Sequence, residues 1–447
     1  MYKKIISVLA AIVIALVPNM VSPAADCSAS VYAEINNPYI PVKSIKPQYP
    51  AKNSFTLAVK QSRVIKVKVY PSDASNKTIR FQSLNRDVAA VNKDGRVVGK
   101  KTGTATIVAV PDDVGKAVIS YKVKVVKRKK GTHSSTKNMK TVKSDSAKYT
   151  YKQMVKDLDR LKAEYSEFLT YSSLGKTADK RNVYEVVIGN KKAKKQVVVQ
   201  ATMHAREYIN SLLVMQQIES ICANYYTGTY NGKYYSEIFD KVGLHVVPMV
   251  NPDGVTISQY GADGIENKKL KSKVKKMCKK YGKGKKSYYT KWKANARGVD
   301  LNRNYPLNWK SYKKSAPSSA DYKGPTAGSE KETKIMIKLI EKVKPKTVIS
   351  YHSTGSIIYW NFRQKGKLQK QCKSIFETAK DLTGYKGAGV SSLGPCFGDW
   401  VCAKKKIPTI TIETGKKPCP IKIKEYKSIW NKNKYILPAI SLWCIKN

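Results

Sequence analysis

Apolar and polar residues alternate with a period of two through much of the first third of the chain. Lysines separate the apolar side chains between Ile65 and Val69, and the stretch from Ala117 to Val125 repeats this alternation. A period of two indicates half-buried strands. Turn sequences such as Lys-Asp-Gly at 93–95 separate the runs at short intervals. The pattern over 43–127 therefore predicts an all-β sandwich.

From residue 149 to residue 447, helical and strand-like patterns alternate. Apolar spacing predicts helices at Tyr151–Tyr165 and Ile209–Tyr225, and an amphipathic stretch near the C-terminus. Strands are predicted at Val183–Ile188, Gln196–Met203, Leu244–Val250, Thr347–Tyr351 and Thr409–Glu413. This alternation is typical of an α/β domain, and we expect a twisted mixed sheet flanked by helices. Residues 128–148 are polar and charged, which predicts a flexible linker between the two domains.

The N-terminus carries one apolar run, Ile5–Val17, between two lysines and a stretch of small residues that reaches Ala25. This order predicts a secretory signal peptide over residues 1–25, and hence a secreted protein. A cell-wall association is expected from the charge of the chain and from the type of its first domain. Thirteen residues fall short of the ~20 that a helix needs to cross a bilayer. We therefore expect no stable membrane span. The alternative is an uncleaved anchor lengthened by 18–21.

The charge of the chain is strongly positive. It has 84 Lys plus Arg against 31 Asp plus Glu, a formal charge of +53, and thirteen of the lysines lie in Lys268–Lys293. Nucleic-acid readers favour Arg, of which there are 11, and no helix-turn-helix, zinc-finger or RRM signature is present, so we expect no nucleic-acid partner. Lysine charges suit an anionic cell-wall polymer. The alternative is compositional drift that leaves a solvated, non-functional surface.

The chain has four histidines, and their positions favour one metal site. His204 follows a predicted strand, Glu207 precedes a predicted helix, and His352 closes another strand. Open α/β sheets place their sites at such carboxyl ends. A catalytic zinc takes three protein ligands of these types and keeps an open position. His133 in the linker and His245 inside a strand fit a solvated and a core histidine, which leaves the other three side chains for one Zn²⁺.

Two further segments carry chemistry. Asp-Leu-Asn-Arg-Asn-Tyr-Pro at 300–306 places a guanidinium beside an amide, although Arg303 could also pair with a structural carboxylate. Glu413 ends an apolar strand, as a site residue or as a solvent-facing cap.

Five segments, TMHAREY, PMVNPDG, ARGVDLNRNYP, SYHSTG and TITIETG, resemble in order and spacing the M14 zinc metallocarboxypeptidases, over roughly 148–447. The resemblance implies an enzyme that hydrolyses peptide bonds with one zinc ion. Its ligands would be His204, Glu207 and His352, and Glu413 would be the general base.

The same resemblance implies substrate-binding roles. Asn302 and Arg303 would dock the terminal carboxylate of the substrate, for which the planar Arg fork is suited. Arg297 is the candidate for stabilising the tetrahedral oxyanion, with Lys293 as its competitor because the alignment can slide here. Arg206 would line the substrate cleft.

Two departures from the family pattern concern specificity. The animal digestive enzymes carry a mobile tyrosine shortly before the Asp-Trp pair, whereas 390–400 contains no tyrosine. Tyr385 is the nearest candidate. Gly398 aligns with the floor of the side-chain pocket, where enzymes specific for basic residues carry an acid, and the neighbouring Asp399 leaves that specificity open.

The stretch FQSLNRDVAAVNKDGRVVGKKTGTATI at 81–107 resembles the bacterial Ig-like domain, group 2. Such modules are spacers or adhesive units on bacterial surface proteins, and no catalytic cluster accompanies it here.

The motifs WKANARGVDLNRNYP and FGDW resemble most the bacterial branch that includes γ-D-glutamyl-diaminopimelate peptidases. Together with export and basicity, this implies that the substrate is a peptidoglycan stem peptide. A general secreted carboxypeptidase, a deacylase of the aspartoacylase type and a non-catalytic cell-wall-binding protein remain alternatives. The complete DLNRN and NPDG motifs argue against the deacylase.

Overall fold

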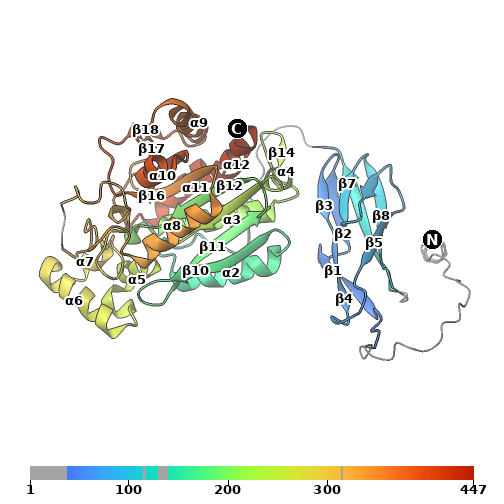
Figure 1. The fold of residues 1–447 in the computed structure, drawn as a ribbon, viewed down its shortest axis with the longest axis horizontal. Coiled ribbons are helices and arrows are strands. Elements are labelled where there is room, and N and C mark those ends of the chain that lie inside the picture. Colours follow the sequence, from blue (N-terminus) through green and yellow to red (C-terminus); the bar gives the residue numbers. More distant parts are fainter. Residues whose placement is uncertain (1–37, 114–116, 129–138, 314–315) are drawn as a thin grey trace, which may run out of the picture. The chain divides into compact units, whose positions relative to one another are not determined.

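The computed structural model describes residues 38–113, 117–128, 139–313 and 316–447 (Figure 1). The predicted signal peptide 1–25 and His133 lie outside the described residues. The chain divides into two compact units between Lys129 and Lys130. In the part of the chain that is described, every helix is too short or too polar to cross a bilayer.

The regular elements of the first unit, within residues 38–113 and 117–128, are all strands. A four-stranded sheet of order β2-β9-β8-β5 and a three-stranded sheet of order β3-β7-β6 enclose its core, and β1 pairs with β4. Leu57, Ile107 and Tyr121 are fully buried between them. The predicted β-sandwich is confirmed. Its strands are β1 (Ser44–Tyr49), β2 (Ser54–Ala58), β3 (Ser62–Val64), β4 (Lys66–Tyr70), β5 (Ile79–Ser83), β6 (Ala89–Val91), β7 (Arg96–Gly99), β8 (Gly103–Pro111) and β9 (Ile119–Val126).

The second unit is organised around an eight-stranded mixed sheet of order β10-β11-β15-β12-β16-β19-β17-β18. The central strands β15, β12, β16 and β19 run parallel, and β10 and β11 pair antiparallel with their neighbours. Strand β17 pairs antiparallel with β19 and parallel with β18. The predicted mixed α/β sheet is confirmed. The strands are β10 (Leu169–Lys176), β11 (Asn182–Gly189), β12 (Lys195–Ala201), β15 (Val242–Val247), β16 (Thr347–Ser353), β17 (Ile357–Asn361), β18 (Lys386–Gly389) and β19 (Thr409–Thr414), with a separate pair β13 (Thr229–Tyr230) and β14 (Lys233–Tyr234).

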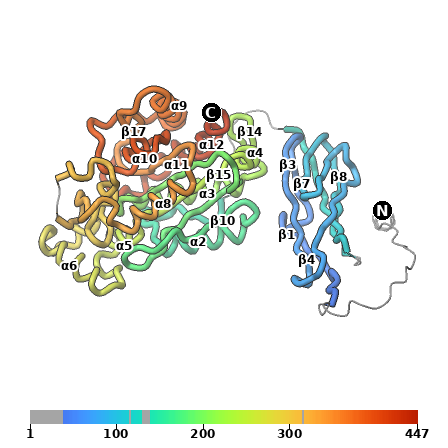
Figure 2. Tube along the Cα trace, viewed as in Figure 1, coloured from blue at the N-terminus to red at the C-terminus, as the bar shows by residue number. Residues whose placement is uncertain are grey.

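Helices cover both faces of this sheet (Figure 2). Along β12, Val197 and Val199 join one core with α2, α3, α9, α11 and α12, while Val198 points to the opposite core under α8 and α10. The helices are α2 (Tyr151–Tyr165), α3 (Ile209–Ala223), α4 (Tyr235–Phe239), α5 (Pro252–Tyr260), α6 (Lys268–Gly282), α7 (Ser287–Thr290), α8 (Lys331–Val343), α9 (Gly366–Thr383), α10 (Phe397–Lys405), α11 (Tyr426–Asn433) and α12 (Ile436–Lys446). Short 3₁₀ turns are η1 (Ala205–Glu207), η2 (Gly261–Gly264), η3 (Leu301–Arg303) and η4 (Ile423–Glu425).

The predicted flexible linker 128–148 is too long at its C-terminal end. The buried carboxylate of Glu219 on α3 accepts the backbone N–H groups of Lys140, Thr141 and Val142 at 2.5, 2.6 and 2.7 Å. The side chain of Val142 is also buried in the core of the second unit. This segment is therefore part of the second unit.

Candidate metal centre

Three side chains converge at the carboxyl edge of the sheet, two from the turn that follows β12 and one from the end of β16. Thr202 leaves β12 with a φ of 57°, which turns the chain so that His204 and Glu207 follow at this edge. His352 lies near the end of β16, which pairs in parallel with β12. Glu207 Oε1 lies 2.9 Å from His204 Nδ1, Glu207 Oε2 lies 3.0 Å from His352 Nδ1, and the two Nδ1 atoms are 3.1 Å apart. All three side chains are buried.

The donor set fits a zinc ion. His204 Nε2 lies 3.2 Å from Asp300 Oδ1, an arrangement that keeps the ring proton on Nε2 and leaves the Nδ1 lone pair for a metal. Burial acts to raise the pKa of Glu207, but His204 and His352 outweigh it and leave the pKa below its usual range. An ionised carboxylate and two imidazoles that converge in a buried position form a typical catalytic zinc set. His204, Glu207 and His352 would hold the ion.

Glu413 lies beside this cluster. It occupies β19 directly opposite His352 in the parallel register. Its Oε2 is buried and has no hydrogen-bond partner. Burial, together with the charge of Glu207, raises the pKa of Glu413 to about 7 against the opposing effects of His352 and Lys293. A carboxyl group with a pKa near neutrality and a free oxygen is suited to accept a proton from water.

The cation at this centre is Lys293 and not Arg297. Lys293 Nζ lies 3.3 Å from Asp300 Oδ2. Burial acts to lower the pKa of Lys293, but the Asp300 carboxylate outweighs it and raises the pKa, which keeps the ammonium charged. Arg297 Nε instead lies 3.6 Å from Glu330, with 49% of its side chain exposed. A turn over 295–298, in which the N–H of Gly298 donates to the Asn295 carbonyl at 3.1 Å, lies after Lys293 and contains Arg297, so the two cations meet different carboxylates.

Asn302 and Arg303 are tied to the metal centre through the backbone of η3. The N–H of Asn302 donates to Asp300 Oδ1 at 3.0 Å, and Asn302 Oδ1 accepts from the N–H of Phe397 at 2.8 Å. Arg303 Nη1 donates to the Asn302 carbonyl at 2.8 Å and to Cys396 Sγ at 3.2 Å. Burial acts to lower the pKa of Arg303, but neighbouring groups, Cys396 and Asp300 first among them, raise it. The guanidinium is thus held in place and charged.

Arg206 is not part of the cluster of metal-ligating atoms. Its Nη1 donates to the carbonyl of Lys291 at 3.4 Å, and its charge lowers the pKa of Cys419, although burial raises that pKa overall. The strand that precedes Cys419 in the chain is β19, which carries Glu413. The charges of Glu207 and Glu413 act to raise the pKa of the same Cys419 thiol, so Arg206 lies close to the candidate site.

The remaining sequence candidates occupy the interior. His245 is a buried sheet residue whose ring nitrogens bond Glu185 at 2.7 Å and Gln196 at 2.8 Å, in agreement with its interpretation as a core histidine. Asp399 is buried, and its Oδ2 accepts from the N–H of Gly394 at 2.7 Å. Burial raises the pKa of Asp399 to about 6.

Asp300 was missed as a functional residue in the sequence. It bonds His204 with one carboxylate oxygen and Lys293 with the other. Burial acts to raise its pKa, but Lys293 and His204 hold the pKa well below its usual range. The sequence signal that could have identified Asp300 is an acidic residue at the start of the segment 300–306, which was assigned to substrate binding.

Comparisons with known proteins agree with this geometry. Residues 154–436 match the family model described as zinc carboxypeptidase, and residues 44–121 match the bacterial Ig-like domain, group 2. The γ-D-glutamyl-L-diamino acid endopeptidase 1 of Lysinibacillus sphaericus is 27% identical over 288 residues, covering 64% of this chain and 70% of that protein. Human mast cell carboxypeptidase A is 24% identical over 240 residues, 52% of each chain. The crystal structure of thrombin activatable fibrinolysis inhibitor shares the fold, with a TM-score of 0.55, 17% identity and coverage of 70% of this chain and 79% of that one.

Proposed function

Because the chain belongs to the M14 family of zinc carboxypeptidases, we propose that it is a secreted peptidase of peptidoglycan stem peptides with Glu413 as its general base. The observation that carries the proposal is the convergence of His204, Glu207 and His352 beside the unpartnered carboxyl oxygen of Glu413. Export itself rests on the predicted signal peptide 1–25. Recovery of the protein from culture medium with its N-terminus near residue 26 would support it, and retention of the intact N-terminus in the cell would contradict it.

The side chains divide the reaction between them. A bound zinc ion would supply Lewis-acid activation, lowering the pKa of water from about 15.7 toward ~7 and polarising the scissile carbonyl. Glu413 takes the proton of the attacking water and returns it to the leaving amine. Lys293, held by Asp300, provides a preorganised positive charge for the oxygen that becomes negative in the transition state. Asn302 and Arg303 bind the carboxylate of the residue that is released.

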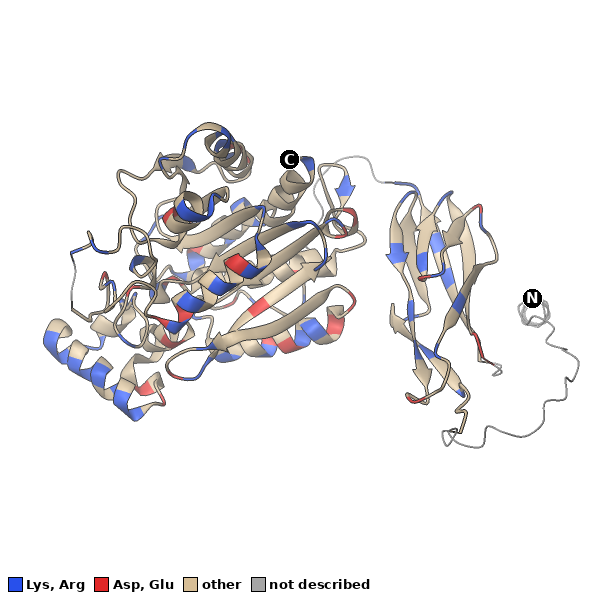
Figure 3. Cartoon of the chain, viewed as in Figure 1, with Lys and Arg blue, Asp and Glu red and all other residues tan. Residues whose placement is uncertain are grey.

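The substrate class rests on three observations. A relative of 27% identity is named for cleavage next to γ-D-glutamyl residues. The chain also carries an Ig-like unit of a bacterial type. The third observation is the basic surface of α6, which Figure 3 shows as the helix with the densest row of cations.

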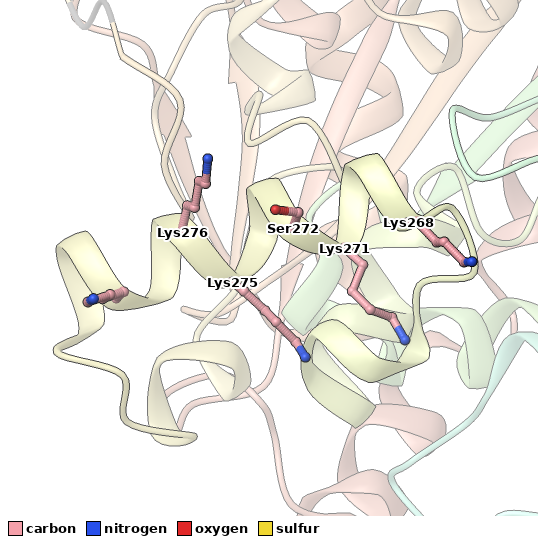
Figure 4. Close-up of a pocket in the computed structure, with 6 residues that line it drawn as sticks. Lys268, Lys271, Ser272, Lys275 and Lys276 are labelled. Atoms are coloured by element: carbon pink, nitrogen blue, oxygen red, sulfur yellow. The ribbon is translucent and has the colours of Figure 1, made fainter.

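The basic surface of α6 supports an anionic wall polymer as a second partner. Four lysines and a serine labelled in Figure 4 line, with Lys279, a shallow hollow of about 380 Å³. Among the described residues, the only carboxylate in ion-pair contact with the α6 lysines is Asp263, at 3.8 Å from Lys271 and 3.4 Å from Lys275. The apolar side of α6 packs through Met277 against a core that includes Trp292 and Ala205. A polymer bound on α6 would thus be held at a constant distance from the metal centre.

The substrate can be tested directly. Purified protein would be incubated with L-Ala-γ-D-Glu-meso-diaminopimelate and with blocked dipeptides, with and without a chelator. We expect the protein to hydrolyse the tripeptide, and we expect the chelator to abolish this hydrolysis. Glu413→Gln should keep stoichiometric zinc and lose activity by about 10²–10⁴-fold, the usual contribution of a general base.

Each other outcome identifies a rival function. Cleavage of the blocked dipeptides alone would identify a general secreted carboxypeptidase. Stoichiometric zinc without hydrolysis of either class would point to a non-catalytic cell-wall-binding protein. Undiminished turnover in Glu413→Gln would remove that residue from the role of base.

A further inference from the structure

Arg303 has a hydroxyl partner on a loop that follows η3. Its Nε donates to the phenol oxygen of Tyr312 at 3.1 Å, and the Tyr312 ring centre lies 5.4 Å from the guanidinium carbon. A phenol can accept and donate at the same time. Because Arg303 uses the acceptor side of Tyr312, the phenol proton remains available to a further acceptor.

The loop that carries Tyr312 is anchored a few residues before it, at Asn308 and Trp309. The indole N–H of Trp309 donates to the carbonyl of Lys323 at 2.9 Å, and the amide of Asn308 donates to the carbonyl of Leu393 at 3.0 Å. The N–H of Tyr312 donates to the Trp309 carbonyl at 3.3 Å. The phenol is therefore positioned by the surrounding scaffold.

Two more donors around Arg303 are unused. Asn302 Oδ1 is occupied by the N–H of Phe397, which leaves the Asn302 NH₂ group to donate. Within the described residues, neither this NH₂ group nor Arg303 Nη2 has a hydrogen-bond acceptor. An amide, a guanidinium and a phenol that all offer donors match a carboxylate, which only accepts.

The tyrosine that sequence comparison offered does not reach this group. Tyr385 is buried in the core, with its hydroxyl bonded by Asn433 Nδ2 at 3.2 Å, and 390–400 contains no tyrosine. We propose that Tyr312 donates a hydrogen bond to the carboxylate of the substrate residue that Asn302 and Arg303 bind, an inference that rests on the proposed peptidase function.

The test compares the binding and hydrolysis of two ligands by Tyr312→Phe and by the parent protein. They are L-Ala-γ-D-Glu-meso-diaminopimelate with a free carboxylate next to the scissile bond, and the same tripeptide with that carboxylate amidated. Binding is measured by calorimetry in zinc-loaded Glu413→Gln, and hydrolysis in the otherwise native chain. Tyr312→Phe keeps the aromatic ring in contact with the guanidinium of Arg303. If Tyr312 had only a structural role, the substitution would change the binding of both ligands equally.

We expect Tyr312→Phe to weaken binding of the free acid about tenfold and to leave the affinity for the amide unchanged. In the hydrolysis assay the substitution should raise KM and leave kcat unchanged. The exposed Tyr260 (53% accessible) provides the control, since Tyr260→Phe should leave the affinity for both ligands unchanged. Equal binding of the free acid by Tyr312→Phe and its parent would overturn the inference, even if hydrolysis proceeds. Absence of hydrolysis by the native chain would overturn the proposed function, while the binding comparison would still decide the role of Tyr312.

Discussion

At the scale of single residues, Asp300 explains why the cations of the site are arranged as they are. Its two carboxylate oxygens contact His204 and Lys293, at 3.2 and 3.3 Å. The same carboxylate therefore orients a metal ligand and holds a positive charge beside it. Arg297 has a different carboxylate, Glu330, and takes no part in this network.

The roles of the two cations can be separated by substitution. Lys293→Ala should lower kcat by about 10²–10³-fold, because it removes a preorganised charge from the position where the oxyanion forms. Arg297→Ala should change kcat by no more than about threefold, since its side chain is half exposed and pairs elsewhere. Steady-state kinetics on the tripeptide, with zinc content measured for each variant, provide the check. A larger loss in Arg297→Ala than in Lys293→Ala would reverse the assignment.

At the scale of secondary-structure elements, the start of α8 contains a buried acid that opposes folding at high pH. Glu332 is 1% exposed, and its Oε1 has no hydrogen-bond partner. Burial, reinforced by Asp253, raises its pKa to about 8, whereas a glutamate in an unfolded chain titrates near ~4.3. Between these values the unfolded chain ionises and the folded protein does not. The contribution of Glu332 to stability is thus complete below about pH 4 and is lost as the pH rises toward 8.

Glu332→Gln should remove this pH dependence, because an amide does not ionise. We expect little change in the free energy of unfolding at pH 5 and a gain of a few kcal/mol over the parent at pH 8. Denaturant unfolding of both proteins at the two pH values measures these free energies. The control is Glu341→Gln on the same helix, whose side chain is 51% exposed. The same stability difference at both pH values would contradict the raised pKa.

A second element-scale prediction concerns α6. Lys268, Lys271, Lys275 and Lys279 follow one side of this helix, and the first and last lie about 16 Å apart along its axis at 1.5 Å per residue. Like charges at this spacing repel one another, and a linear polyanion would neutralise them.

Replacing these four lysines by Gln should weaken binding of poly(glycerol phosphate) about tenfold at low salt, and the difference should shrink as salt screens the charges. The matched control replaces four exposed lysines of α9, namely Lys367, Lys370, Lys373 and Lys380. Sedimentation or calorimetry with the polymer gives the affinities. An equal loss in both sets would favour a diffuse surface charge without a specific binding face.

At the scale of the whole molecule, the boundary of the second unit lies further toward the N-terminus than composition indicates. Glu219 is fully buried, and its carboxylate depends on the N–H groups of Lys140, Thr141 and Val142. Removing those donors would leave a charged group buried without partners, which is costly.

Two truncated chains test this boundary. Residues 139–447 should fold, bind one zinc ion and hydrolyse the tripeptide as the full chain does. Residues 149–447 should melt at least about 5 °C lower, because three hydrogen bonds to a buried carboxylate are lost. Differential scanning calorimetry measures both. Identical melting temperatures would show that residues 139–148 contribute nothing to the fold.

Local patterns account for much of what could be predicted. Alternation along Ile65–Val69 and the apolar runs of β12, β16 and β19 identified strands. Strands β10 and β18, with the sequences LTYSSLGK and KGAG, gave weaker patterns and were missed. Two predicted strands, Gln196–Met203 and Leu244–Val250, extended past the observed ends of β12 and β15. In β12 the strand ends because the chain turns at Thr202, which has a φ of 57°. Edge strands face solvent more than central strands do, so their sequences carry less of the period that reveals a strand.

The amino-acid sequence by itself determined the two folding units, the positions of the central strands along the chain and the residue types available at their carboxyl ends, because hydrophobic periodicity acts over short stretches of chain. It also determined that His204, Glu207 and His352 were available as a zinc set. Only the tertiary structure decided that Lys293 faces the centre in place of Arg297, that Asp300 links it to His204, and that Tyr312 contacts Arg303. Those outcomes depend on turns and on distances between segments far apart in the chain, where a shift of a few ångströms changes which charge meets which partner.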